Sequence, residues 1–137
     1  MDIIEYPNSA EDITPAQLDG FFVGWPNPPT PETHLRLLRN SDAVVLAVDT
    51  ATGQVVGFIT AITDGVLAAY IPFLEVLPAY QYQGIGQTLV RRMLERLQDL
   101  YMIDLLCDAD VQSFYEQFGM YPAVGMCTRN FDRQSGQ

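Results

Sequence analysis

One stretch near the middle of the chain constrains its fold more than any other: residues 74–89, which read LEVLPAYQYQGIGQTL. An extended apolar run ends at Pro78, two glycines follow with one residue between them, and a long amphipathic helix then begins. The first N–H groups of a helix lack partners within it and carry partial positive charge. Glycine lets a ligand come close to the backbone. The stretch therefore predicts a strand, a loop and a helix start that together bind an anion.

The length of the chain predicts a single domain, and its charge limits the ligands that this domain could bind. The 137 residues suffice for one domain with its own core, which we expect to span residues 1–137. A net charge of −10 argues against binding nucleic acid or an anionic membrane surface. No apolar run is long enough to cross a membrane, and the first residues do not resemble a signal peptide. Cys107 and Cys127 then suit free thiols, and we predict a cytoplasmic protein.

Hydrophobic periodicity and turn residues predict an α/β (α+β) fold, a mixed and mostly antiparallel sheet flanked by helices in the order β-αα-βββ-α-β-α-β. Strands are expected at 2–6, 43–48, 55–62, 66–77, 101–107 and 125–131, and helices at 14–23, 30–40, 85–100 and 111–118. Pro72 should interrupt the longest strand because it lacks a backbone N–H. His34 is expected on an exposed helix face, and the tail after Arg133 is expected to fray.

The glycine spacing excludes two common phosphate-binding loops. A P-loop needs Lys followed by Ser or Thr, which is absent after Gly86, and a dinucleotide fingerprint needs a small residue where this chain has Leu89. The remaining pattern, Gln81-x-x-Gly84-x-Gly86 between a strand and a helix, resembles the acyl-CoA-binding signature of the GNAT family of N-acetyltransferases. The downstream segment Phe114-Tyr115-Glu116-Gln117-Phe118-Gly119-Met120 resembles the family's F-Y-E-x-x-G-F segment, and the order of elements is also similar.

This resemblance implies acetyl-CoA as the cofactor and suggests how the chain would hold it. The backbone of residues 74–76 would pair with the pantetheine arm, the N–H groups of residues 82–87 would hold the pyrophosphate, and Tyr115 would protonate the departing thiolate or hydrogen-bond its sulfur. Asp108 takes the position of an asparagine that often touches the cofactor. The implied cofactor-binding residues are Leu74, Glu75, Val76, Gln81, Tyr82, Gln83, Gly84, Ile85, Gly86, Gln87, Thr88, Asp108 and Tyr115.

The loop also departs from the family pattern in two places. Tyr82 stands where the family usually has glycine or asparagine, and Gln83 stands where it often has Lys or Arg. The pyrophosphate would therefore be held by amides and the helix dipole with little side-chain charge. The nearest cations are the arginines of the following helix, Arg91, Arg92 and Arg96.

Acyl transfer to an amine needs a neutral nucleophile, a polarised thioester carbonyl and a proton for the thiolate. Tyr115 is the candidate acid, and Glu75 is the candidate base, with a purely structural glutamate as the alternative. Trp25, Asp64 and Tyr70 are candidate residues for binding the acceptor, and no metal site is expected.

The resemblance therefore implies an acetyl-CoA-dependent N-acetyltransferase that acts on a primary amine, which we expect to be a small molecule. The alternatives are a protein N-terminal or lysine acetyltransferase and a non-catalytic acyl-CoA-binding module. Members of the family are often dimers, so a homodimer is expected.

Overall fold

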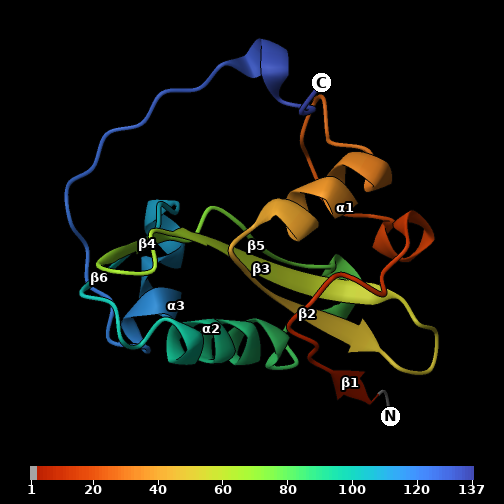
Figure 1. The fold of residues 1–137 in the computed structure, drawn as a ribbon, viewed down its shortest axis with the longest axis horizontal. Helices are drawn as coiled ribbons and strands as arrows, with labels where there is room; N and C mark the ends of the chain where they lie inside the picture. Colours follow the sequence, from red (N-terminus) through yellow and green to blue (C-terminus); the bar gives the residue numbers. More distant parts are fainter. Residues whose placement is uncertain (1–2) are drawn as a thin grey trace.

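The structure is a computed structural model that describes residues 3–137, in which helices cover the faces of one mixed sheet (Figure 1). The predicted α/β class is confirmed. The strands are β1 (Ile4–Glu5), β2 (Ala43–Asp49), β3 (Val55–Thr63), β4 (Ala68–Tyr70), β5 (Leu74–Val76) and β6 (Met102–Asp104). The helices are α1 (Pro31–Asn40), α2 (Ile85–Arg96) and α3 (Gln112–Glu116), with short 3-10 turns η1 (Pro15–Leu18), η2 (Pro78–Tyr80), η3 (Ala109–Val111) and η4 (Phe131–Arg133).

The sheet has the order β1-β2-β3-β4-β6. β5 also pairs with β3, at residues 57–59, whereas β4 pairs with β3 at residues 62–63. All pairs are antiparallel except β4 with β6, which run parallel. A parallel pair needs a crossover connection, and α2 supplies it between β5 and β6. The sequence prediction of a mixed, mostly antiparallel sheet is therefore confirmed.

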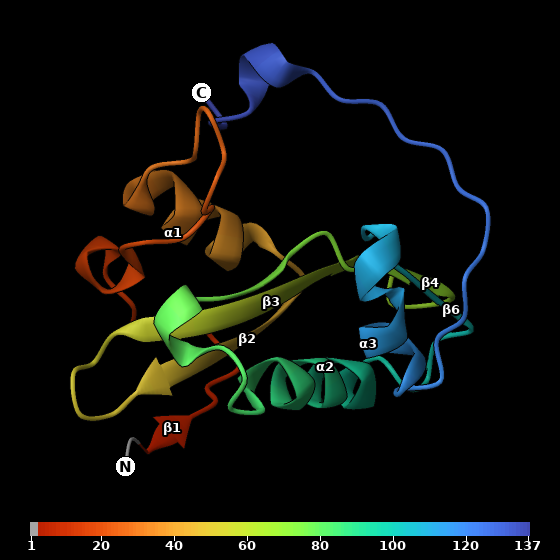
Figure 2. The same cartoon turned by 180° about the vertical axis from the view of Figure 1, so that it is seen from behind.

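Two hydrophobic layers hold the helices against the sheet. On one face α2 buries Leu89 and Met93 completely, and on the other face α1 packs with η1 (Figures 1 and 2). Gly57 of β3 lets α2 approach, because a Cβ at that position would lie 3.1 Å from Leu89 Cδ1. Of the helices within residues 3–137, none combines the length and the apolar character that a membrane crossing requires.

Pro72 interrupts the long extended segment, as the sequence predicts. The Ile71 N–H donates to Asp104 O of β6 at 2.9 Å, whereas Phe73 O accepts from the Thr60 N–H of β3 at 3.1 Å. The segment therefore divides into β4, which pairs with both β3 and β6, and β5, which pairs with β3 alone.

The prediction of a full helix near residue 14 is wrong. The expected capping box is present, with the Thr14 N–H donating to Gln17 Oε1 at 2.9 Å, but only the 3-10 turn η1 follows. The chain then passes through left-handed conformations at Gly20 (φ +95°), Phe22 (φ +61°) and Gly24 (φ +83°), which no helix can contain.

The predictions for the C-terminus are also wrong. The strand expected at residues 125–131 is absent from the described residues 3–137: residues 125–130 belong to no sheet, and Phe131 begins η4. The tail after Arg133 does not fray but lies against the start of α1, where Gln137 Nε2 donates to Thr33 Oγ1 at 2.8 Å. Gln134 Oε1 also accepts from the Asn27 N–H at 2.9 Å.

His34 is buried, not on an exposed face as the sequence suggested. Its ring is 1% exposed and lies 4.4 Å from Phe58, 4.8 Å from Phe22 and 5.3 Å from Phe21, measured between ring centroids. Neither ring nitrogen has a hydrogen-bond partner among the described residues. Burial lowers the pKa of His34 from 6.5 to about 4, because the charged ring would lose its hydration.

We therefore predict that the protein loses stability as the pH falls from 6.5 to 4. In this window the unfolded chain binds a proton at His34 that the folded chain does not, and this shift corresponds to about 3 kcal/mol of unfolding free energy. Urea unfolding of wild type and His34→Phe at several pH values would show it: the variant should lose this component, whereas Glu32→Gln on the same helix should keep it. Parallel pH curves for wild type and His34→Phe would contradict the prediction.

Candidate active site

The division of the strand leaves part of the β5 backbone without a neighbour. In an antiparallel pair, alternate residues point their N–H and C=O groups toward the partner strand. The Leu77 N–H donates to Val56 O and Phe73 O accepts from Thr60, so residues 73, 75 and 77 face β3. Leu74 and Val76 consequently point their N–H groups away from β3, toward the side on which β6 diverges. This edge of β5 is free to hydrogen-bond an extended ligand.

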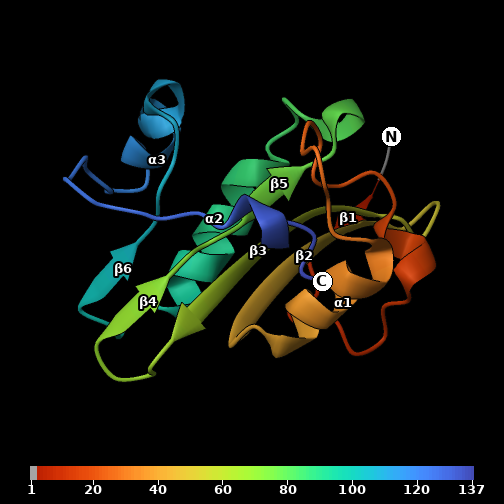
Figure 3. The same ribbon diagram turned by 90° about the horizontal axis from the view of Figure 1, so that it is seen from above.

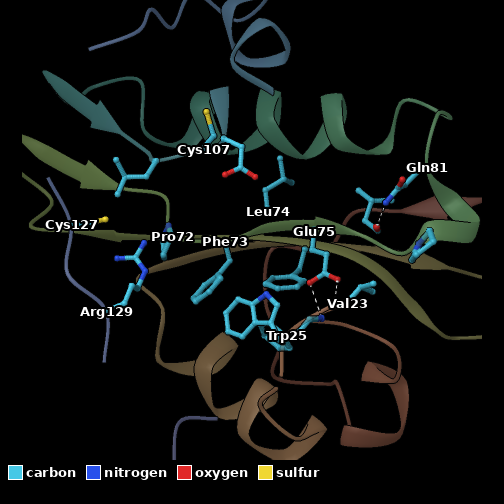
Figure 4. Close-up of a pocket in the computed structure, with 16 residues that line it drawn as sticks. Val23, Trp25, Pro72, Phe73, Leu74, Glu75, Gln81, Cys107, Cys127 and Arg129 are labelled. Carbon is cyan, nitrogen blue, oxygen red and sulfur yellow. Dashed lines mark hydrogen bonds between the residues drawn. The ribbon is translucent and has the colours of Figure 1, made fainter. Parts of the chain in front are cut away.

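A pocket of about 770 Å³ lies at this opening (Figure 4). Its walls come from the loop after η1, β3, the break between β4 and β5 with β5 itself, η2 and the residue after it, the segment after β6, and the extended C-terminal segment. The lining residues are Phe22, Val23, Trp25, Phe58, Pro72, Phe73, Leu74, Glu75, Val76, Pro78, Gln81, Leu106, Cys107, Asp108, Cys127 and Arg129.

Glu75 joins β5 to the loop that forms the opposite wall. Its Oε1 accepts from the Phe22 N–H at 2.9 Å and its Oε2 accepts from the Val23 N–H at 3.3 Å (Figure 4). Phe22 has a positive φ of +61°, an uncommon conformation for a residue with a side chain, and the carboxylate holds this turn in place. Glu75 therefore has a structural role, and it also faces the pocket.

The loop after β5 presents the N-terminus of α2. Tyr82 (φ +64°) and Gly84 (φ +85°) are left-handed, and Gly84 is the N-cap residue. The first helical hydrogen bond runs from the Thr88 N–H to Gly84 O at 3.1 Å, so the N–H groups of residues 85–87 have no partner within the helix. A Cβ at Gly84 would meet nothing within 4 Å, so the space beside it is open. The expected geometry for binding an anion is present.

Side chains add little positive charge to this loop. Arg91 lies over the Phe118 ring at 5.7 Å and Arg92 over the Tyr6 ring at 5.0 Å. Arg96 donates to Val44 O at 2.9 Å. The Thr88 hydroxyl donates to Gly84 O at 3.0 Å. An anion here would therefore be held mainly by backbone N–H groups.

Gln81 and Gln83 stabilise the loop itself. Gln81 Nε2 donates to Val76 O at 3.0 Å, a carbonyl that faces away from β3, and Gln83 Nε2 lies 3.5 Å from Ala79 O. The Tyr82 side chain is fully exposed.

Tyr115 lies on α3, which packs beside the start of α2: a Cβ at Gly86 would be 3.5 Å from the neighbouring Phe114 ring. Burial raises the pKa of Tyr115 to about 12, and the nearby Cys107 adds to the increase. Cys107 lines the pocket, although Tyr115 does not. The pKa of the Cys107 thiol is itself raised by burial and by the charges of Asp108 and Asp110. Tyr115 thus keeps its proton at neutral pH.

The structure brings one of the three predicted acceptor residues to the pocket and leaves the other two apart from it. Trp25 lines the pocket together with Glu75 and Asp108, but Asp64 and Tyr70 do not. The Asp64 Oδ1 accepts from the N–H groups of residues 66, 67 and 68 at 2.8, 2.9 and 3.2 Å, which lowers the pKa of its carboxyl and fixes the turn between β3 and β4.

Sequence reasoning missed three polar residues of the pocket, Cys107, Cys127 and Arg129. Cys127 and Arg129 belong to the C-terminal segment, and no local pattern relates that segment to residues 72–76. Among residues 3–137, Arg129 is the only cationic side chain that lines the pocket, and its Nη1 donates to Thr128 O at 3.0 Å. The acidic site thus includes one positive charge that could contact a bound molecule.

Comparisons with known proteins agree with this geometry. The model of the acetyltransferase (GNAT) family matches residues 10–120. The solved structure of a candidate acetyltransferase from Deinococcus radiodurans R1 is 51% identical, with a TM-score of 0.93 over 96% of this chain and 92% of that chain. The chloroplastic GCN5-related N-acetyltransferase 3 of Arabidopsis thaliana is 41% identical over 71 residues, 50% of this chain and 30% of the relative.

A more distant aminoglycoside N-acetyltransferase, solved in complex with CoA, shares the fold with a TM-score of 0.66 and 13% identity over 95% of each chain. The chain spans between 30% and 58% of the length of the curated relatives it matches.

We predict that Glu75→Gln lowers the unfolding free energy by about 1 kcal/mol. The amide keeps one acceptor oxygen but turns an NH2 group toward the second backbone donor, so one of the two hydrogen bonds is lost. Urea unfolding would measure the change, with Glu95→Gln on the exposed face of α2 as the control. Equal stability of the two variants would show that the contact does not hold the loop.

Proposed function

The chain belongs to the acetyltransferase (GNAT) family, and from this premise we propose that it transfers the acetyl group of acetyl-CoA to the primary amine of a small molecule. The observation that carries the proposal is the continuity of the site. A Cβ at Gly86 would lie 3.9 Å from Val76 Cγ2, so the start of α2 adjoins β5, and β5 in turn lines the pocket. One elongated molecule with an anionic end could therefore contact the start of α2, the edge of β5 and the pocket.

The residues present fit acetyl-CoA in chemical character. The N–H groups at the start of α2 and in residues 82–84 would hold the pyrophosphate, and the open space beside Gly84 leaves room for it. The N–H groups of Leu74 and Val76 would bond the pantetheine amides. The CoA complex of the aminoglycoside N-acetyltransferase supports this proposal, since that protein has the same fold.

The thioester supplies an activated acetyl group, and the chain supplies the proton transfers. Tyr115, protonated at neutral pH, would donate a hydrogen bond or its proton to the leaving sulfur. Glu75 would accept a proton from the amine, directly or through water, with the lone pairs that Phe22 and Val23 leave unused. A free N–H of β5 would stabilise the negative charge that develops on the carbonyl oxygen.

The pocket supports a small acceptor. Its volume of about 770 Å³ lies in the range of small-molecule sites, roughly 300–1,000 Å³. The aromatic rings of Phe22, Trp25 and Phe73 form an apolar wall, and Glu75 and Asp108 provide negative charge for an ammonium group. The loop after η1 and the C-terminal segment both border the pocket, which leaves less room for a polypeptide. The two exposed thiols suit a reducing compartment, and the cytoplasm remains our proposal.

Thermal unfolding with acetyl-CoA, followed by thiol release with a panel of amines, tests the function. Acetyl-CoA should raise the unfolding temperature, since it binds only the folded chain. Thiol release should then occur with small primary amines. Release with peptides alone would support a protein acetyltransferase, and binding without release would support a non-catalytic module. The absence of any shift with acetyl-CoA would count against all three.

The pair Gly84→Asp and Gly84→Asn tests where the anion binds. Both residues tolerate the left-handed conformation at this position better than other side chains do, and they are nearly identical in shape. We predict that Gly84→Asp weakens acetyl-CoA binding at least about tenfold more than Gly84→Asn, because a carboxylate repels the pyrophosphate. Isothermal titration calorimetry would measure both affinities. Equal affinities would place the pyrophosphate elsewhere.

A further inference from the structure

Arg129 reaches the pocket from the C-terminal segment, residues 121–130. Figure 3 shows this segment crossing from α3 toward α1. It touches the pocket wall at Leu106, since a Cβ at Gly125 would lie 3.5 Å from Leu106 Cδ2. Directly after Arg129, the Asn130 side chain caps η4, which leads into the tail that bonds α1. Arg129 therefore extends from a segment that is held on both sides of it.

The guanidinium of Arg129 has donors that the chain does not use. Its Nη1 donates to Thr128 O at 3.0 Å, and among residues 3–137 it forms no ion pair and no other side-chain hydrogen bond. A planar guanidinium can bind a carboxylate through two parallel hydrogen bonds. The arginines engaged elsewhere are Arg36, Arg39 and Arg96, which donate to backbone carbonyls, and Arg91 and Arg92, which lie over aromatic rings.

Aromatic side chains separate Arg129 from the candidate base. The rings of Trp25 and Phe73, whose centroids lie 6.3 Å apart, line the pocket. In Figure 4 these rings lie between the Arg129 guanidinium and the Glu75 carboxylate. Glu75 belongs to β5, where the thioester would lie, so the reacting amine belongs at the Glu75 end of the pocket. The Arg129 end would repel a second positive charge and attract a negative one.

We propose that Arg129 selects acceptors that carry a carboxylate at the end opposite the reacting amine, with an apolar spacer between the two. The class is that of ω-amino acids, because an α-amino acid places both charged groups on one carbon and cannot engage residues that two rings separate. One guanidinium in a chain of net charge −10 balances one negative charge, which favours a carboxylate over a doubly charged phosphate. The inference rests on the proposed function, since it names the acceptor class of the same site.

Acetylation kinetics with two probes of matched shape test the inference. One is 4-(aminomethyl)benzoate, and the other is 4-(aminomethyl)benzamide, in which a neutral amide replaces the carboxylate. Wild type should acetylate the benzoate with a kcat/KM at least about tenfold higher, mainly through a lower KM, because a charge-assisted contact is added. Phenylalanine, an α-amino acid with an aromatic ring, should be a poorer acceptor than the benzoate.

Variants of two arginines show whether the preference belongs to Arg129. Arg129→Gln should abolish the preference for the benzoate while the kcat/KM for the benzamide stays within about twofold of wild type. Arg129→Lys, which keeps the charge, should retain part of the preference. The control Arg133→Gln removes the same charge from η4, outside the pocket, and should keep the full preference.

Several results would overturn the inference while leaving the acetyltransferase function intact. They are equal kcat/KM values for the two probes in wild type, an unchanged preference in Arg129→Gln, an equal loss of preference in Arg133→Gln, a preference for phenylalanine, and turnover confined to amines without a carboxylate. Thiol release with no amine at all would instead contradict the proposed function, so the two failures are distinguishable.

Discussion

Pro72 divides one extended segment between two neighbours, and the site depends on that division. On one side of it Ile71 bonds β6, and on the other side Phe73 bonds β3. An unbroken strand would have continued along β6, and the N–H groups of Leu74 and Val76 would have been used within the sheet. The interruption leaves these groups pointing away from β3, while β3, most of whose residues are buried, fixes the position of β5.

An aromatic layer supports the wall opposite this edge. Phe22, Phe58 and Phe73 contact one another at ring distances of 6.0 to 6.4 Å, and His34 lies behind them. The uncharged His34 ring fills space that a protonated ring could occupy only at a high cost of desolvation. Glu75 then joins this layer to β5 through the two N–H groups of the loop. The Glu75 carboxylate therefore holds the loop that forms one wall of the pocket, and it also faces the pocket as the candidate base. The position of that wall and the position of the base consequently depend on the same hydrogen bonds.

Much of the fold could be predicted from the sequence because its signals are local. Thr30 and Pro31 mark the start of α1, Gly84 marks the start of α2, and Pro72 marks the break. The positions of Glu75 and His34 could not be predicted in this way. Glu75 bonds the N–H of a residue 53 positions earlier, and His34 is buried by three rings from two other segments. Such contacts depend on the packed structure, in which distant segments meet.

The C-terminal segment shows the opposite situation, in which local sequence favours a strand that the described chain does not complete. The stretch from Gly125 to Phe131 follows a turn residue and contains apolar residues, which predicts a strand. A strand also requires a neighbour that accepts its hydrogen bonds, and no backbone–backbone hydrogen bond among residues 3–137 involves residues 121–129. The tail beyond the segment is attached to α1, where Gln137 Nε2 donates to Thr33 Oγ1. Glu75 therefore reaches the pocket from a paired strand, whereas Cys127 and Arg129 reach it from a segment whose position depends on attachments at its ends.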